Sequence, residues 1–299
     1  MPEFKENFLE HYSELTDIET FKEFCVKPIK KSIRINTLKI SVNDFKKISK
    51  LKLRQVPWFE SGFYIDEIVK GLGNTPHHQL GYFYMQESAS MIPPLVLAPE
   101  NDLILDMCAS PGSKTTEMAQ LMDNKGLIVA NDYKINRIKS LSANLQRCGV
   151  SNTVTTIMEG RFFKNNKFDK ILVDAPCSGT GTIRKSLRTI KEWNLNTVKR
   201  IAGTQRQLIR TAFENLKENG TLVYSTCSLE PEENEGIINY LLETFENAKL
   251  EKINLKLKSS PVILEYKNNK YSSEIKNCLR LWPQDNDTDG FFVAKIKKI

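Results

Sequence analysis

Between residues 102 and 299 the hydrophobic positions fall into short continuous runs, and most of these runs are separated by stretches with helical spacing. Runs of this kind predict strands that are buried on both faces. We expect six of them: DLILDM (102–107), GLIVAND (126–132), NTVTTIM (152–158), FDKILVDAP (168–176), TLVYSTCS (221–228) and GFFVAKIKK (290–298). The alternation of strand and helix predicts an α/β fold, a doubly wound and mostly parallel sheet with helices on both faces.

Four stretches between these runs have hydrophobic residues at helical spacing. They are SKTTEMAQLM (113–122), RIKSLSANLQRCG (137–149), the long segment 196–220 and EENEGIINYLLETF (232–245). Glycine ends many helices because it adopts the left-handed conformation without strain. We therefore end the second helix at Gly149 and the long helix at Gly220.

The first 84 residues have a different pattern, which predicts a small mixed unit. Its elements are a strand over 32–38, a helix within 42–53 capped by Asn43 or Asp44, and a strand over 60–65. A loop rich in breakers, KGLGNTPHHQLGY, follows over 70–82. We therefore place a domain boundary after it, with residues 1–84 as a small α+β domain and residues 85–299 as the larger α/β domain.

Polar and reactive residues follow the expected strands, at the edge where doubly wound sheets bind their ligands. The segments at this edge are DMCASPGSK (106–114), ND (131–132), MEGR (158–161), DAPCSGTG (174–181) and STCSLEPEEN (225–234). Since the carboxyl ends of parallel strands share one edge, we expect these segments to form a single site.

The turn CASPGSK (108–114) leads from the first strand into a helix, and its small residues let a ligand approach the backbone. Asp132 suits an acceptor for ribose hydroxyls. A dinucleotide site would need GxGxxG, but Gly112 stands alone. The segment GSKT resembles the end of a phosphate loop, but Ser113 separates the glycine from the lysine, which are adjacent in that motif. We interpret the pattern as a site for an adenosine ligand without a triphosphate, namely S-adenosyl-L-methionine.

Two thiols, Cys177 and Cys227, follow consecutive strands and share a pocket if those strands are neighbours. Their polar surroundings favour access over burial, although two buried structural cysteines or a redox pair are alternatives. Methylation of C5 in cytosine or uracil needs a thiolate that adds to C6 and a second group that assists its departure. Asp174 is placed to contact N3 and N4 of such a base, and Lys114 to lower the pKa of a thiol.

Composition indicates the partner and the compartment. The net charge is +7, and the segments 27–54 and 184–210 contain many lysines and arginines with one acid each, Asp44 and Glu192. Two stretches of this kind suit a nucleic-acid backbone. Six cysteines without a CxxC pair or a cluster with histidine predict free thiols and no metal site. With no apolar run that could cross a bilayer and no signal peptide, we expect a cytoplasmic protein without a membrane partner.

Five segments closely resemble, in order and spacing, the motifs of the Nop/Sun family of RNA 5-methylcytosine methyltransferases. They are LDMCASPGSKT, NDYKINR, ILVDAPCSGTG, YSTCSLEPEENE and TDGFFVAK. RINTL (34–38) and GYFYMQESASM (81–91) resemble upstream segments of the same family. The resemblance implies a Rossmann-like class I methyltransferase domain and an RRM-like, RNA-binding domain over residues 1–84.

The resemblance also implies roles for individual residues. Cys227 is then the nucleophile, and Cys177 helps to release the product. The residues implied to line the cofactor and base pocket are Cys108, Ala109, Ser110, Pro111, Gly112, Ser113, Lys114, Asp132, Arg137, Glu159 and Asp174. Two positions depart from the family, which usually has aspartate at position 159 and glycine at position 113.

A compact enzyme of this kind is expected to act on transfer RNA as a monomer, with ribosomal RNA as the second candidate. A base in structured RNA would have to be extruded into the pocket. Two other functions are considered: a nucleotide hydrolase built on GSKT, and a non-catalytic RNA-binding or assembly factor that keeps the fold.

Overall fold

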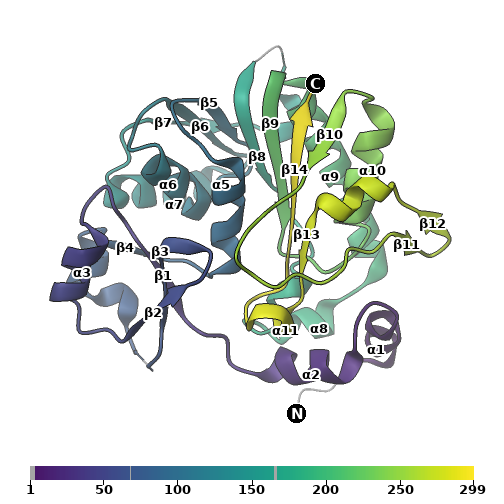
Figure 1. Cartoon of the computed structure of the whole chain (residues 1–299), viewed down its shortest axis with the longest axis horizontal. Helices are drawn as coiled ribbons and strands as arrows, with labels where there is room; N and C mark the ends of the chain where they lie inside the picture. The colour runs from purple at the N-terminus through teal and green to yellow at the C-terminus, as the bar shows by residue number, and fades with distance from the viewer. Residues whose placement is uncertain (1–3, 68, 165–166) are drawn as a thin grey trace.

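A large central sheet forms the core of the computed structural model, which describes residues 4–67, 69–164 and 167–299 (Figure 1). Its strand order is β10–β14–β9–β8–β5–β6–β7, with β13 also paired to β14. The strands are β5 Leu103–Asp106, β6 Leu127–Asp132, β7 Thr153–Ile157, β8 Phe168–Asp174, β9 Leu216–Thr226, β10 Ala248–Glu251, β13 Leu279–Leu281 and β14 Phe291–Lys298. All six expected runs form strands of this one sheet.

The middle of the sheet is parallel, as expected. Strands β9, β8, β5, β6 and β7 run in the same direction. Strand β14 is antiparallel to both of its neighbours, β9 and β10, and pairs with β9 from Phe292 opposite Thr226 to Lys297 opposite Thr221. The carboxyl ends of the parallel strands therefore meet at one edge, where the ligand segments follow them.

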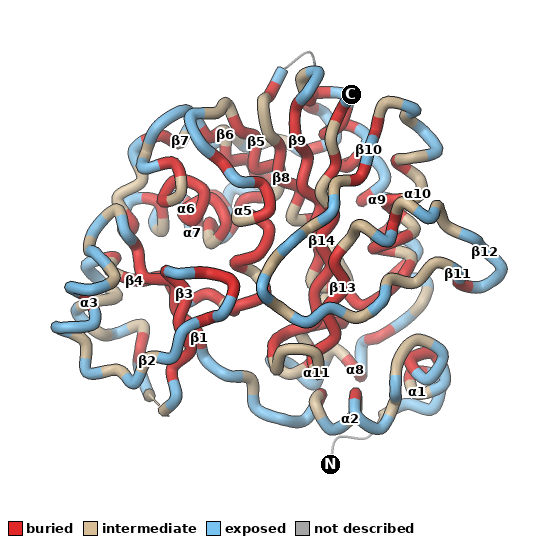
Figure 2. The backbone as a smooth tube through the Cα atoms, viewed as in Figure 1, coloured by how far each residue is buried: buried red, intermediate tan, exposed pale blue. Residues whose placement is uncertain are grey.

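Helices cover both faces of the sheet (Figure 1). Helices α5 Ile92–Leu97, α6 Ser113–Leu121 and α7 Ile135–Cys148 pack over one face, and α9 Leu195–Glu214 and α10 Glu235–Thr244 pack over the other. Adjacent residues of β5 belong to different hydrophobic clusters, Ile104 to the first and Leu105 to the second, because successive side chains of a strand point to opposite faces. Figure 2 shows these strands as the most continuously buried part of the chain.

Helix α7 ends at Gly149 as predicted, with a φ of +73°. The long helix α9, however, ends at Glu214 and not at Gly220, so that prediction was wrong. The backbone N–H of Phe168 in β8 donates to the carbonyl of Asn215, and Leu216 already lies opposite Phe168 in β9. Pairing with β8 thus replaces the helical hydrogen bonds six residues earlier than the glycine signal indicated.

A second, antiparallel sheet has the strand order β2–β3–β1–β4 and carries a helix, α3. Its elements are β1 Ser32–Ile35, α3 Val42–Ile48, β2 Leu53–Val56, β3 Phe59–Ile65 and β4 Phe83–Met85. Ser41 caps α3, since its Oγ accepts the backbone N–H of Asp44 at 3.1 Å. The predicted caps, Asn43 and Asp44, were wrong because both lie in the first turn of the helix.

Two N-terminal helices, α1 Glu6–Ser13 and α2 Ile18–Val26, pack on the larger unit and not on the small sheet. Phe8, Tyr12 and Phe21 form a buried cluster with Trp193 and Trp282. The rings of Phe8 and Trp193 meet edge to face, with centroids 5.5 Å apart. The domain boundary after residue 84 stays a prediction. Helices α1 and α2 precede that boundary in the sequence, but they pack against residues that follow it.

The remaining elements are short. They are α4 Pro76–Gln79, α8 Arg188–Glu192, α11 Pro283–Asn286, β11 Glu265–Tyr266, β12 Asn269–Lys270 and 3-10 turns over Leu72–Asn74, Ala89–Met91, Gly160–Phe162, Thr180–Thr182 and Ser273–Asn277. Helix α11 packs against α2. In the described part of the chain no helix has the length and apolar character needed to cross a membrane.

Candidate active site

The thiols of Cys177 and Cys227 meet at the carboxyl edge of the large sheet. Strand β8 lies beside β9 with Asp174 opposite Ser225, so the two loops that follow are adjacent. The Sγ atoms are 3.2 Å apart, within reach of an S–H···S hydrogen bond, and neither cysteine forms a disulfide. This hydrogen bond, together with burial, raises the pKa of Cys177 well above the usual value of a thiol. Cys177 therefore keeps its proton near neutral pH and can donate it toward the Cys227 sulfur.

Close backbone contacts hold the two loops together. The N–H of Gly181 donates to the carbonyl of Cys227 at 2.9 Å, and the N–H of Gly290 donates to the carbonyl of Gly181 at 2.9 Å. A Cβ atom at position 181 would collide with the carbonyl oxygens of Gly290 and Cys227, so the approach requires glycine. The hydroxyls of Ser178 and Ser228, 3.0 Å apart, join the loops a second time.

An ion pair lies beside the thiols. The Nζ atom of Lys114 is 2.7 Å from Oδ2 of Asp174, and the hydroxyl of Ser225 donates to Oδ1 of the same carboxylate at 2.9 Å. Burial disfavours the ammonium of Lys114, but the Asp174 carboxylate outweighs burial and raises the pKa of Lys114. The ammonium also interacts electrostatically with Cys227. The site thus holds a fixed positive charge where negative charge on sulfur would develop.

The turn 108–114 joins β5 to α6 and is tied to the end of β6. Arg137 donates from Nε to both carboxylate oxygens of Asp132 at 3.0 Å, and from Nη2 to the carbonyl of Ser110 at 2.8 Å. The N–H of Ser110 also donates to Asp132, at 3.3 Å. Gly112 has a φ of +103°, a conformation that favours glycine, at the start of α6. The turn, Asp132 and Arg137 therefore form one connected unit.

These residues fit S-adenosyl-L-methionine. A buried carboxylate at Asp132 beside a turn of small residues suits ribose hydroxyls. Tyr133 and Ile135, which follow it, are 54% and 56% exposed and offer apolar surface to an adenine ring. Asp106 is buried at the end of β5; its Oδ2 accepts from Thr115 at 2.6 Å, and its Oδ1 has no partner among the described residues. Burial raises the pKa of Asp106 to about 7. A polar or cationic ligand atom would satisfy the open oxygen.

One of the expected cofactor residues, Glu159, lies apart from this hydrogen-bonded unit. Glu159 follows β7, is exposed, and accepts from Nε of Arg161 at 2.7 Å. Within residues 4–67, 69–164 and 167–299 no hydrogen bond joins its carboxylate to Asp132 or to the turn 108–114. Burial raises the pKa of the Cys108 thiol far above its usual value, so this cysteine stays protonated and acts as a small packing residue.

Sequence reasoning missed the buried polar groups that support the site. The guanidinium of Arg34 in β1 donates to Gln86 at 2.9 Å, to Thr116 at 2.7 Å and to Gln120. Thr116 and Gln120 lie on α6, so Arg34 links the small sheet to the helix that follows the turn 108–114. Glu117 of α6, 4.0 Å from Arg34, is also buried, and burial raises its pKa to about 8. The sequence signal that could have indicated these buried polar groups was Arg34 itself, a charged residue in the apolar strand of the RINTL segment.

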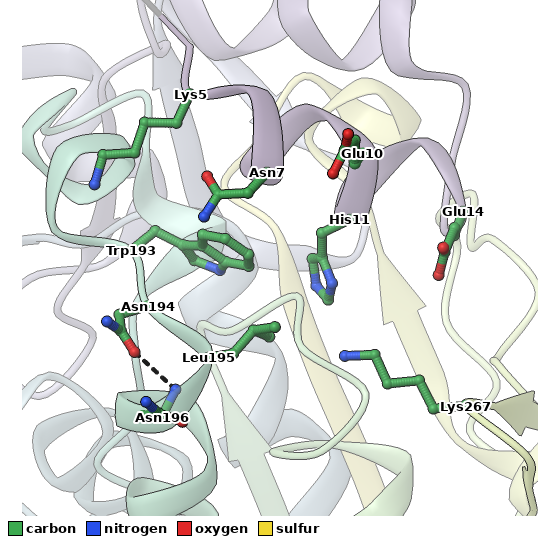
Figure 3. Close-up of a pocket in the computed structure, with 10 residues that line it drawn as sticks. All are labelled: Lys5, Asn7, Glu10, His11, Glu14, Trp193, Asn194, Leu195, Asn196 and Lys267. Carbon is green, nitrogen blue, oxygen red and sulfur yellow. Dashed lines mark hydrogen bonds between the residues drawn. The ribbon is translucent and has the colours of Figure 1, made fainter.

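A separate pocket of about 480 Å³ lies beside α1 (Figure 3). Its lining residues are Lys5, Asn7, Glu10, His11, Glu14, Trp193, Asn194, Leu195, Asn196 and Lys267. None of the residues expected to bind the cofactor or the base lines this pocket. In Figure 3 the His11 ring points away from the α1 ribbon into the space between Trp193 and Lys267.

Two family models match the chain, one after the other. Residues 94–297 match the model of the 16S rRNA methyltransferase RsmB/F family, and residues 3–88 match that of the N-terminal domain of 16S rRNA methyltransferase RsmF. The tRNA (cytosine(49)-C(5))-methyltransferase of Pyrococcus abyssi is 45% identical over 296 residues, which cover 97% of this chain and 95% of that protein. The ribosomal RNA small subunit methyltransferase F of Vibrio atlanticus is 45% identical over 309 residues, which cover 98% of this chain but only 64% of the longer relative.

Solved structures agree with these matches over the whole chain. A methyltransferase homolog protein from Pyrococcus horikoshii superposes with a TM-score of 0.85 at 36% identity, covering 99% of this chain and 100% of that one. The crystal structure of NSun6 from Pyrococcus horikoshii with SFG superposes with a TM-score of 0.87 at 27% identity, covering 99% of each chain. The chain therefore belongs to the RsmB/F (Nop/Sun) family and is an S-adenosylmethionine-dependent RNA cytosine-C5 methyltransferase.

Proposed function

We propose that this enzyme methylates C5 of a cytosine in transfer RNA, with Cys227 as the nucleophile. The observation that supports the mechanism most directly is the 3.2 Å separation of the Cys177 and Cys227 sulfurs beside the Asp174–Lys114 ion pair. C5 of cytosine becomes a good nucleophile only after a thiolate has added to C6. S-adenosyl-L-methionine supplies the methyl group when it is bound.

In the proposed attack, Cys227 loses its proton to water and its sulfur forms a bond to C6. The electron pair of the C5–C6 double bond then moves to C5. The pKa of Cys177 is raised by its hydrogen bond to Cys227 and by burial, and the ammonium of Lys114 interacts electrostatically with Cys227. Asp174, held by Lys114 and Ser225, contacts N3 and N4 of the base.

In the proposed release, the C5–H bond of the methylated adduct breaks and its proton passes to water. The electron pair re-forms the C5–C6 double bond, the C6–S bond breaks, and its pair returns to the sulfur of Cys227. The S–H group of Cys177, 3.2 Å away, donates a hydrogen bond to this departing sulfur. Cys177 thereby assists release by stabilising the leaving thiolate.

Transfer RNA is proposed as the substrate because of similarity. A relative that is 45% identical to this chain over 296 residues is named as a tRNA methyltransferase. Ribosomal RNA is the second candidate, since a relative named for ribosomal RNA is equally similar over the shared part.

The two basic stretches expected to contact RNA meet beside the site. The guanidinium of Arg184 donates to the carbonyls of Lys27 and Pro28 at 3.0 and 2.9 Å. Arg184 lies three residues after Gly181, whose N–H binds the carbonyl of Cys227. Lys27 and Lys30, which shares Asp287 with Arg184, therefore lie close to the segment that follows the loop of Cys177, where phosphates that flank the target base would pass.

The experiment incubates the protein with labelled S-adenosyl-L-methionine and separate tRNA and 16S rRNA pools. We expect label in 5-methylcytosine of the tRNA pool, no covalent RNA adduct with Cys227→Ala, and an accumulating adduct with Cys177→Ala. Cys278→Ala, which removes a free thiol immediately before β13, is the matched control and should behave as the wild type. Adduct formation by Cys227→Ala but not by Cys177→Ala would make Cys177 the nucleophile, and label confined to 16S rRNA would reject tRNA as the substrate.

A further inference from the structure

The loop that carries Cys227 is anchored by a helix from the opposite end of the chain. Glu230 lies three residues after Cys227, and its carboxylate accepts three hydrogen bonds: from Tyr12 Oη at 2.6 Å, His11 Nε2 at 2.8 Å and Trp193 Nε1 at 2.9 Å. None of these donors belongs to β9 or to its loop. Two of them lie on α1, more than 200 residues earlier in the sequence.

Glu230 is ionised although it is completely buried. Burial opposes ionisation, but the hydrogen bonds from His11, Tyr12 and Trp193 outweigh it and hold the pKa of Glu230 below its usual value. A buried carboxylate that loses a donor is left with an uncompensated charge, which is strongly unfavourable. The carboxylate therefore has one favourable position, and α1 defines it.

The chain between Glu230 and Cys227 has little freedom. The N–H of Glu230 donates to Ser228 Oγ at 3.1 Å, and the N–H of Leu229 donates to Thr180 Oγ1 at 2.9 Å. The carbonyl of Leu229 accepts from Arg280 at 3.0 Å. A displacement of Glu230 is therefore transmitted through two bonded residues to the position of the Cys227 sulfur.

Helix α1 is itself held rigidly. Tyr12 stacks against Phe21 of α2 with ring centroids 5.0 Å apart, and Phe8 meets Trp193 edge to face at 5.5 Å. The other ring nitrogen of His11 lies 3.3 Å from the hydroxyl of Tyr266, and the His11 ring lies against Trp193 at the pocket of Figure 3. The donors to Glu230 thus have fixed places of their own.

We propose that His11 and Tyr12 of α1 are positioning residues for the methyl-transfer reaction, acting through Glu230 on the loop that carries Cys227. Helix α1 then stabilises the loop that carries Cys227 and does not belong to the RNA-binding unit. This inference rests on the proposed function for the identity of Cys227 as the nucleophile. Its structural part, that α1 fixes the loop, holds independently of the substrate.

The kinetic test compares variants that remove donors with a variant that removes packing only. We expect Tyr12→Phe combined with His11→Leu to slow covalent adduct formation at saturating RNA by about tenfold to a hundredfold, because the sulfur is misplaced. The KM for RNA should change by less than about twofold, since no RNA contact is lost. Tyr12→Phe combined with His11→Gln, which restores a donor near the place of Nε2, should recover much of the rate.

Phe21→Leu is the matched control, because it loosens the same aromatic cluster and leaves all three donors to Glu230 in place. Its rate should stay within about twofold of the wild type even if its melting temperature falls. Equal rate losses in Phe21→Leu and in Tyr12→Phe/His11→Leu would overturn the proposal, since the loss would then come from general destabilisation.

A second measurement needs no RNA. Hydrogen exchange at the backbone amides of Leu229 and Glu230 should accelerate in Tyr12→Phe/His11→Leu and stay unchanged in Phe21→Leu. Unchanged protection in the donor variant rejects the inference whatever the RNA results are. If the wild type forms no adduct with any RNA, the proposed function fails, while the exchange data still decide whether α1 fixes the loop.

Discussion

Arg34→Met is expected to lower the free energy of unfolding by about 2–6 kcal/mol, the cost of leaving two buried acceptors without a donor. The guanidinium is completely buried, and its loss leaves the acceptor oxygens of Gln86 and Gln120 without donors. Each buried acceptor left unsatisfied costs about 1–3 kcal/mol. Glu117 adds little to this sum, because its pKa of about 8 leaves its carboxyl protonated and uncharged at neutral pH.

Urea unfolding followed by circular dichroism measures this change, with Arg54→Met as the matched control. Arg54 lies in the same small sheet, but its side chain is 47% exposed and pairs with Asp66 at 2.8 Å on the surface. Such pairs contribute at most about 1 kcal/mol. If Arg34→Met and Arg54→Met lower the free energy of unfolding by equal amounts, the buried guanidinium does not hold the small sheet to α6.

Two further predictions concern a glycine and a buried acid. Gly181→Ala forces its Cβ into the carbonyls of Gly290 and Cys227, so it should lower both the melting temperature and the methylation rate. Gly203→Ala is the control: it lies in α9 with no atom near its Cβ and should stabilise the protein by about 0.5–1 kcal/mol. Equal effects of the two substitutions would refute the contact argument. Glu117 holds its proton up to about pH 8 in the folded state, against an ordinary pKa of 4.5, so the folded state binds more protons in this window and wild-type stability falls as pH rises through it. Glu117→Gln removes this fall, so its melting temperature relative to the wild type should be higher at pH 8 than at pH 5; the same difference at both pH values would contradict the shift.

The strands and their ligand edge were predictable because their signals are local. Continuous apolar runs determine burial on both faces, and parallel strands then bring Asp132, Asp174 and the two thiols to one edge without further information. The end of α9 was not predictable from Gly220, because pairing of Leu216 with β8 overrides a local glycine signal.

The supporting shell could not be predicted for a different reason. Glu230 is one of several acids in the segment EPEEN, and His11 and Tyr12 stand in an N-terminal segment that mixes acids with aromatics. Their structural role depends on contacts between residues more than 200 positions apart in the sequence, and no local pattern predicts such contacts. The sequence therefore indicated the two thiols and the carboxylates at the sheet edge but not the buried residues that bond to Glu230.

The antiparallel insertion of β14 between β9 and β10 bears on how the enzyme is made. Until residues 291–298 have been synthesised, β9 has a free edge, and the strand that leads to Cys227 lacks its partner at Thr226. An unpaired apolar strand of this kind is a site for mispairing with other chains. The loop of Cys227 is therefore complete only after residues 291–298 have joined the sheet, so a nascent or truncated chain that lacks them would carry the turn 108–114 but leave Thr226 without its strand partner and β9 with an aggregation-prone edge.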